Sequence, residues 1–172
     1  MPETRRRLDT ILDPSFVEGL DDLSFEQLRD RREMVDHVET ELSYYRRLLH
    51  GRIDLLAFEM RRRRGEESRT LIEALPEILA GSDQPGGGKG RSMRGGFAPP
   101  LDFEVGRRQI DRILEDGFLA NLPATSDEEL AAVDEMLREA EREISGQRSQ
   151  VHTVHDALQT EISDRYAADR SS

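Results

Sequence analysis

Five polar residues of five different types occur twice in this chain at the same spacing, E-x3-S-x2-R-x3-H-x3-D. Arginine offers a planar guanidinium group that can pair with a phosphate or with the O6/N7 edge of guanine, or stack on a base. Aspartate accepts two hydrogen bonds, which the N1–H and N2–H₂ edge of guanine can donate. The first ridge is Glu39, Ser43, Arg46, His50 and Asp54, and the second ridge is Glu141, Ser145, Arg148, His152 and Asp156.

The other three residue types of each ridge suit the same kind of ligand. Serine is small, so a flat or bulky ligand can approach the helix backbone while the hydroxyl group remains available. Histidine can stack, or bond to a phosphate or a base, and glutamate can bond a sugar hydroxyl or a base edge, or orient the arginine one helical level away. Together the ridge residues predict a binding site for guanine and phosphate that is presented twice.

Each ridge needs a long α-helix to bring its residues together. Steps of four, three, four and four residues return to one helical face, so a ridge fills an arc of about 80° over roughly 22 Å. The sequence predicts such helices at 24–64 and 126–168. Each begins at a capping box, in which Ser24 with Gln27, and Ser126 with Glu129, bond the first free backbone N–H groups.

Apolar residues recur every seven positions in both predicted helices, which indicates a coiled coil. We assign these apolar residues to heptad position a, which places the glutamate and arginine of each ridge at position e. The e flanks of two helices adjoin only if the helices are antiparallel. We therefore predict an all-α fold, an antiparallel two-helix coiled coil whose two ridges share one polar face about a pseudo-twofold axis. A second apolar series is interrupted by polar residues such as Arg31 and Gln147, so we expect a weak seam that a partner can complete. This second series consists of Val38, Tyr45, Val133, Ala140 and Val154. The heptad residues are Leu28, Val35, Leu42, Leu49, Leu56, Leu130, Leu137, Ile144, Val151 and Leu158.

The chain is an internal duplication. Residues 5–59 and 107–161 are identical at 20 of 55 positions, at an offset of 102 residues and without a gap. We predict repeat 1 at 1–64, a connector at 65–106 and repeat 2 at 107–172, each repeat starting with a short hook such as Leu8 to Leu20. Glycine and proline dominate 81–100, which we expect to be disordered, and Pro76 interrupts a possible short helix from Ser68 to Ala80.

Composition limits the possible classes of protein. Of the 172 residues, 35% are hydrophobic and 35% are charged, which suits a thin helical bundle. The net charge of −11 favours a basic protein partner over direct DNA binding. The absence of cysteine excludes disulfides and thiol chemistry. We find no secretory signal and no apolar run of membrane-spanning length, so we expect a soluble, cytoplasmic protein.

Alternatives to a nucleotide site remain at this stage. A metal-dependent enzyme could use His50 with Asp54 and His152 with Asp156, since four-residue spacing places two ligands on one helix face. A structural or oligomerising coiled-coil adaptor would need no ligand, and a single ridge could be a solvated face. The GGGKGRS stretch in the connector lacks the spacing of a phosphate-binding loop. Because no nucleophile is evident, we expect the chain not to be an enzyme.

The ridges resemble the E-x3-S-x2-R-x3-Q-x3-D signature of the RsiG family, actinobacterial anti-sigma factors whose antiparallel coiled coil carries one copy on each helix. The resemblance implies that the ten ridge residues bind cyclic di-GMP as an intercalated dimer, with no metal required of the protein. It also implies that the nucleotide-loaded chain sequesters a WhiG-type sigma factor of the sporulation and flagellar class and represses its transcription. The sequence departs from the signature at His50 and His152, where histidine replaces glutamine and introduces a group that titrates near neutral pH.

Overall fold

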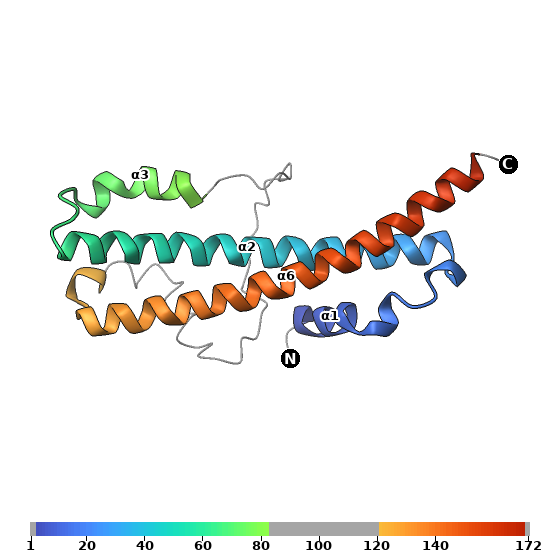
Figure 1. Ribbon diagram of the computed structural model, residues 1–172, viewed down its shortest axis with the longest axis horizontal. Coiled ribbons are helices and arrows are strands. Elements are labelled where there is room, and N and C mark those ends of the chain that lie inside the picture. The colour runs from blue at the N-terminus through green and yellow to red at the C-terminus, as the bar shows by residue number, and fades with distance from the viewer. Residues whose placement is uncertain (1–2, 83–120, 171–172) are drawn as a thin grey trace. The chain divides into compact units, whose positions relative to one another are not determined.

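The computed structural model describes residues 3–82 and 121–170, and every regular element in these two ranges is helical (Figure 1). The predicted all-α class is therefore confirmed for these residues. The hook predicted at 107–120 and most of the stretch predicted to be disordered, 83–100, lie outside them. In chain order the elements are α1 (Glu3–Leu12), η1 (Pro14–Phe16), η2 (Leu20–Asp22), α2 (Phe25–Arg63), α3 (Leu71–Ser82), η3 (Leu122–Ala124) and α6 (Asp127–Asp169).

The described residues form two compact units that do not follow the boundaries of the two repeats. Unit 1 contains residues 3–44 and 144–170, and unit 2 contains residues 45–82 and 121–143. Each unit therefore joins the first half of one long helix to the second half of the other. Repeat 1 and repeat 2 contribute complementary parts to both units.

Within each unit, α2 and α6 run antiparallel, as predicted from the e positions of the ridge residues. Residues later in α2 pair with residues earlier in α6, which only an antiparallel pair allows. The cross-helix pairs are Asp36–His155 and Glu39–Arg148 in unit 1, and Arg46–Glu141 and Arg63–Asp127 in unit 2.

Both long helices begin at the predicted capping boxes. The backbone N–H of Ser24 donates to the side-chain oxygen of Gln27 at 2.8 Å, and the N–H of Gln27 donates to the Ser24 hydroxyl at 3.2 Å. Ser126 and Glu129 exchange the same two bonds at 3.0 and 3.2 Å. The observed helices start and end within one residue of the predicted limits.

The C-terminus of α2 is closed by glycine. Gly65 has a φ of 77°, a backbone conformation that residues other than glycine rarely adopt. Its N–H donates to the carbonyl oxygen of Arg62 at 3.0 Å, and the next N–H, of Glu66, donates to that of Arg61 at 3.0 Å. This pair of bonds satisfies carbonyl groups that the helix end would otherwise leave unpaired.

The predicted heptad series forms the core between α2 and α6. All ten heptad residues have no exposed surface, and Val38, Tyr45 and Ala140 of the second series are also buried, whereas Val154 is half-buried. Each fully buried aliphatic side chain contributes about 1.5–3 kcal/mol to folding. The seam therefore stabilises the pairing of α2 and α6 through residues that are distinct from those of the ridges.

A third helix, α3, extends unit 2 beyond the predicted pair. Pro76 lies inside α3 and does not end it, contrary to our expectation of an interruption. The N-terminus is fixed by a further capping box, because the N–H of Thr70 donates to Glu73 at 2.7 Å and the N–H of Glu73 donates back to the Thr70 hydroxyl at 3.3 Å. The buried Ala74 is part of the face that α3 turns inward.

Helix α3 accounts for apolar residues of α2 that lie outside the heptad series. Leu55 and Phe58 are only 3% and 1% exposed, and α3 lies beside this part of α2 (Figure 1). The corresponding residues of repeat 2, at the offset of 102, are Ala157 and Thr160. The second half of α6 thus lacks the apolar pair that α3 covers on α2.

The first hook packs on α2 within unit 1. Leu8, Ile11 and Phe16 are buried, and η1 begins at Pro14, where the sequence predicts a turn. Arg31, which interrupts the apolar seam, donates to the carbonyl oxygen of Phe16 and places its guanidinium carbon 5.1 Å from the centre of the Phe16 ring. A residue that weakens the heptad pattern therefore serves to attach the hook.

Candidate functional site

Unit 1 contains one half-site, built from the start of the first ridge and most of the second. Glu39 lies on α2, and Arg148 of α6 donates from Nε to its Oε1 at 3.0 Å. The same Nε lies 2.8 Å from the hydroxyl of Ser43, which itself donates to Glu39 at 2.7 Å. His152 Nε2 lies 3.5 Å from the same Glu39 oxygen. One carboxylate oxygen thus gathers three groups, two of them from the other helix.

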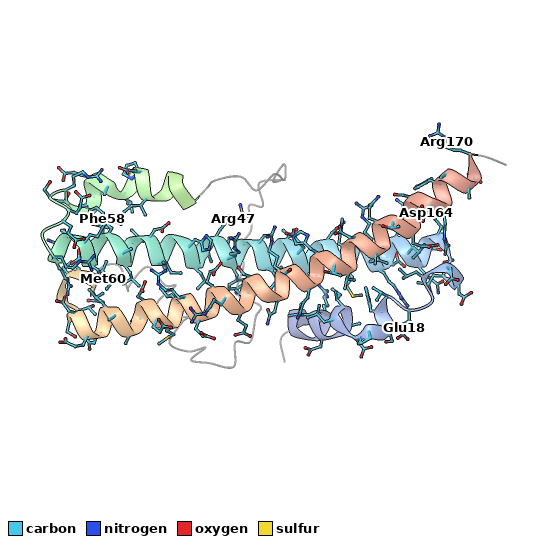
Figure 2. All side chains as sticks on the ribbon, viewed as in Figure 1. Glu18, Arg47, Phe58, Met60, Asp164 and Arg170 are labelled. Carbon is cyan, nitrogen blue, oxygen red and sulfur yellow. The ribbon has the colours of Figure 1, made fainter. Side chains whose placement is uncertain are left out.

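Unit 2 contains the matching half-site with the two helices exchanged. Here Glu141 of α6 provides the carboxylate, and Arg46 of α2 donates to its Oε1 from Nε at 3.2 Å. His50 Nε2 lies 2.9 Å from that oxygen. Arg47, the exposed neighbour of Arg46, is labelled in Figure 2. The glutamate, arginine and histidine of both ridges are therefore brought together, always with the glutamate of one repeat facing the basic residues of the other.

The pairing corrects one sequence expectation about the glutamates. We considered each glutamate as a residue that could orient the arginine one helical level away. Instead, each arginine pairs with the glutamate that begins the other ridge, seven residues before that ridge's own arginine. Seven residues along one helix span about 10.5 Å, whereas adjoining e flanks bring the glutamate of one helix and the arginine of the other directly within reach.

Partial exposure keeps both half-sites accessible. Side-chain exposure is 38% for Arg46 and 22% for Glu141 in one, and 31% for Arg148 and 26% for Glu39 in the other. Water screens such pairs, so each contributes only about 0.2–1 kcal/mol. A ligand that offers stronger bonds to the guanidinium groups can therefore replace the carboxylates at modest cost.

The remaining ridge residues lie at the edges of the half-sites. Asp54 is exposed, and Asp156 has 81% of its side chain exposed, with His155 Nδ1 at 3.4 Å. Ser145 is half-buried on α6. The structure does not bring either aspartate into the ion-pair clusters, so both carboxylates face solvent and can accept bonds from a ligand.

Two arginines outside the ridges make the same structural contact in the two units. Arg63 donates to the carbonyl oxygens of Leu122 at 2.9 Å and Thr125 at 2.7 Å, in the turn that precedes α6. Arg165 donates to the carbonyl oxygens of Leu20, at 2.7 Å, and Leu23, in the turn that precedes α2. We call Arg63 and Arg165 the clamp arginines.

Sequence reasoning missed the clamp arginines although the repeat contains them. They are related by the offset of 102 residues, as are the two turns that they hold, but the comparison of 5–59 with 107–161 stops just short of them. Their acceptors are backbone carbonyl groups, which leave no pattern of residue types. Extending the repeat by four residues would have found the pair.

A buried carboxylate orients one of the clamp arginines. Glu59 has only 3% of its side chain exposed and accepts bonds from Arg62 Nε and Arg63 Nε, both at 2.8 Å. The hydrogen bond from Arg62 lowers the pKa of Glu59 below its usual value, with Arg63 adding to the effect and burial opposing it. Glu161 makes the corresponding contact with Arg165 at 2.6 Å.

Other kinds of site find no support within the described ranges. No group of three or more histidine, aspartate or glutamate side chains in 3–82 and 121–170 could hold a metal ion. None of the helices described here is both long and apolar enough to cross a membrane.

Comparison with known proteins points to the same family as the ridge signature. A family model described as RsiG-like matches residues 14–79, which run from η1 through α2 into α3. The chain therefore carries an RsiG-like domain over these residues, including all of the first ridge. No curated protein matches the chain.

Proposed function

We propose that this protein is a cyclic di-GMP-binding anti-sigma factor that sequesters a WhiG-type sigma factor when loaded with nucleotide. The observation that carries the proposal is the reciprocal pair of half-sites, in which each unit presents an arginine, a histidine and a glutamate from both repeats. Each half-site presents groups that suit a guanine and a phosphate, and the two half-sites are related by the repeat. The ligand is cyclic di-GMP, bound as a dimer by the ten ridge residues.

The chemistry of the half-sites supports a guanine nucleotide in particular. Guanidinium groups pair with phosphate oxygens through two parallel bonds and stack on bases. The exposed carboxylates of Asp54 and Asp156 suit the donor edge of guanine, which adenine lacks. The RsiG-like match over 14–79 includes the first ridge and agrees with the family that the ridge signature resembles.

The charge of the chain supports a sigma factor as partner. Its net charge of −11 complements the basic surfaces with which sigma factors bind promoters. The nucleotide fixes the two helices in the register that the sigma factor recognises, so that its binding energy selects the sequestering form. In this scheme the protein regulates transcription by occluding the sigma factor and catalyses no reaction.

Co-elution of the purified chain with a WhiG-type sigma factor in size-exclusion chromatography tests this function. We expect a complex in the presence of cyclic di-GMP and separate peaks without it. A complex that forms equally well in both conditions would show that the chain is a nucleotide-independent adaptor, the rival that the sequence left open. Cyclic di-AMP serves as the control ligand, since it carries the same phosphates but not the guanine edge.

A further inference from the structure

His155, which is outside both ridges, lies between two aspartates in unit 1. Its Nε2 lies 3.4 Å from Oδ1 of Asp36, which is on α2. Its Nδ1 lies 3.4 Å from Oδ1 of Asp156, the last residue of the second ridge. The imidazole ring therefore connects α2 to one of the two carboxylates that we propose to bind guanine.

The repeat does not reproduce this arrangement in unit 2. At the offset of 102 residues, Ile53 corresponds to His155, and Ile53 is buried. Asp36 corresponds to Arg138, so the acidic acceptor is replaced as well. An isoleucine side chain has no polar atom that could bond the ridge aspartate of unit 2, Asp54. The two half-sites therefore share their ridge residues but differ in the support that the aspartate receives.

The neighbouring ion pairs differ in the same way. In unit 1, Arg32 Nε lies 3.7 Å from Oδ2 of Asp36, whose other oxygen faces His155. The equivalent pair in unit 2 is Asp134 with Arg138, at 2.7 Å, so the two charges are exchanged. Each pair is neutral as a whole, but only unit 1 has an acid at the position that contacts the histidine.

Support from a neighbour matters for Asp156 because most of its side chain is exposed. An exposed side chain loses conformational freedom when a ligand immobilises it, and this loss weakens binding. Guanine donates from N1–H and N2–H₂ in the plane of the base, so the carboxylate must lie in that plane to accept both bonds. A carboxylate has about four acceptor positions, so Oδ1 can accept from His155 and from a ligand together.

We propose that His155 is a positioning residue for Asp156 and that it makes the two half-sites unequal in their preference for guanine. A guanine bound in unit 1 meets a carboxylate that is already held, whereas a guanine bound in unit 2 must order Asp54 itself. This inference rests on the proposed function. It adds a residue outside both ridges to the site and ranks the two ridge aspartates.

Calorimetric titration of the full chain with cyclic di-GMP and with cyclic di-IMP tests the role of His155. Cyclic di-IMP lacks only the 2-amino group of each guanine, so its base donates one bond at this edge and tolerates a rotated carboxylate. His155→Ile, which copies the residue of unit 2, should lower the preference for cyclic di-GMP about two- to tenfold. A purely structural role of His155 would weaken both ligands equally. An unchanged preference would therefore overturn the inference.

Asp36→Ala and Asp30→Ala form a matched pair of variants. Both remove a negative charge from an exposed position of α2 in unit 1, but only Asp36 contacts His155. Asp36→Ala should lower the preference for cyclic di-GMP and add little in combination with His155→Ile, because both act through the same ring. Asp30→Ala should leave the preference unchanged, and equal effects of the two alanines would count against the inference. If His155→Ile does not fold, Asp36→Ala alone provides the test.

The ranking of the two ridge aspartates gives an independent readout. Asparagine replaces one acceptor oxygen of the carboxylate by a donor. Asp156→Asn should therefore reduce the preference for cyclic di-GMP over cyclic di-IMP more than Asp54→Asn does. Equal reductions, or a larger one from Asp54→Asn, would overturn the inference. Absence of cyclic di-GMP binding by the unchanged protein would instead overturn the proposed function.

Discussion

Arg165 holds the backbone carbonyl oxygen of Leu20 at 2.7 Å, and this bond ties the last turns of α6 to the turn that begins α2. The repeat-related bond, from Arg63 to Leu122 at 2.9 Å, does the same for α2 and the start of α6. The end of each long helix thus anchors the beginning of the other. These clamps help to hold the half-sites of each unit in register, because an antiparallel pair fixed at its end cannot slide.

Removing a clamp should destabilise the fold more than removing another arginine of the same helix. Arg63→Gln leaves two backbone carbonyl groups without a charged donor and Arg165→Gln leaves three, which costs about 1.5–3 kcal/mol in free energy of unfolding for each variant. Urea denaturation followed by circular dichroism measures the loss. Arg61→Gln is the control, since Arg61 is exposed at the same helix end and should change stability by less than about 0.5 kcal/mol. Equal effects of all three changes would contradict the clamp.

Replacing glycine by alanine should stabilise the protein at two positions inside the long helices and destabilise it at Gly65. A Cβ atom added to Gly51 or Gly146 would meet no atom within 4 Å, so alanine should stabilise each helix by about 1 kcal/mol. Gly65, with its φ of 77°, should lose about 1 kcal/mol with the same change. Thermal unfolding of the three single variants gives the comparison. Destabilisation by Gly51→Ala would show that its helix face is closed in the folded protein.

Lowering the pH should reduce the contribution of Glu59 to the free energy of unfolding. Because its pKa is lowered in the folded protein, the stabilisation is complete above the unfolded pKa of about 4.3 and is lost as the pH falls through the folded value. Glu59→Gln should therefore cost stability at pH 7 but progressively less below about pH 4. Free energies of unfolding of both proteins between pH 7 and pH 3 test this. A difference that stays constant over that range would contradict it.

The sequence predicts the helices, their limits and their core because each depends on local residue patterns. Ser24 and Ser126 mark the helix starts through capping boxes that need only residues three positions apart. The heptad leucines identify the buried seam, and the ridge residues then fall on the flank that an antiparallel partner must adjoin. Local spacing was therefore sufficient to select the all-α antiparallel pair, but not to identify the pairing of Glu39 with Arg148 and of Glu141 with Arg46.

The parts that were missed depend on contacts with the backbone or on tertiary packing. The clamp arginines bond carbonyl groups, which every residue has. Arg31 appears in the sequence as a defect of the seam, and only the folded hook gives it a partner in Phe16. Pro76 is tolerated inside α3, where a strong N-terminal cap and packing against α2 outweigh its local cost.

Calorimetric titration of a WhiG-type sigma factor into the full chain, with and without cyclic di-GMP, tests the central claim most directly. We expect tight binding only with nucleotide, and its loss in the Arg46→Ala, Arg148→Ala variant, whereas Arg47→Ala, which removes an exposed neighbouring charge, should bind normally. Sigma binding that is independent of the nucleotide, or that survives loss of both ridge arginines, would contradict the account.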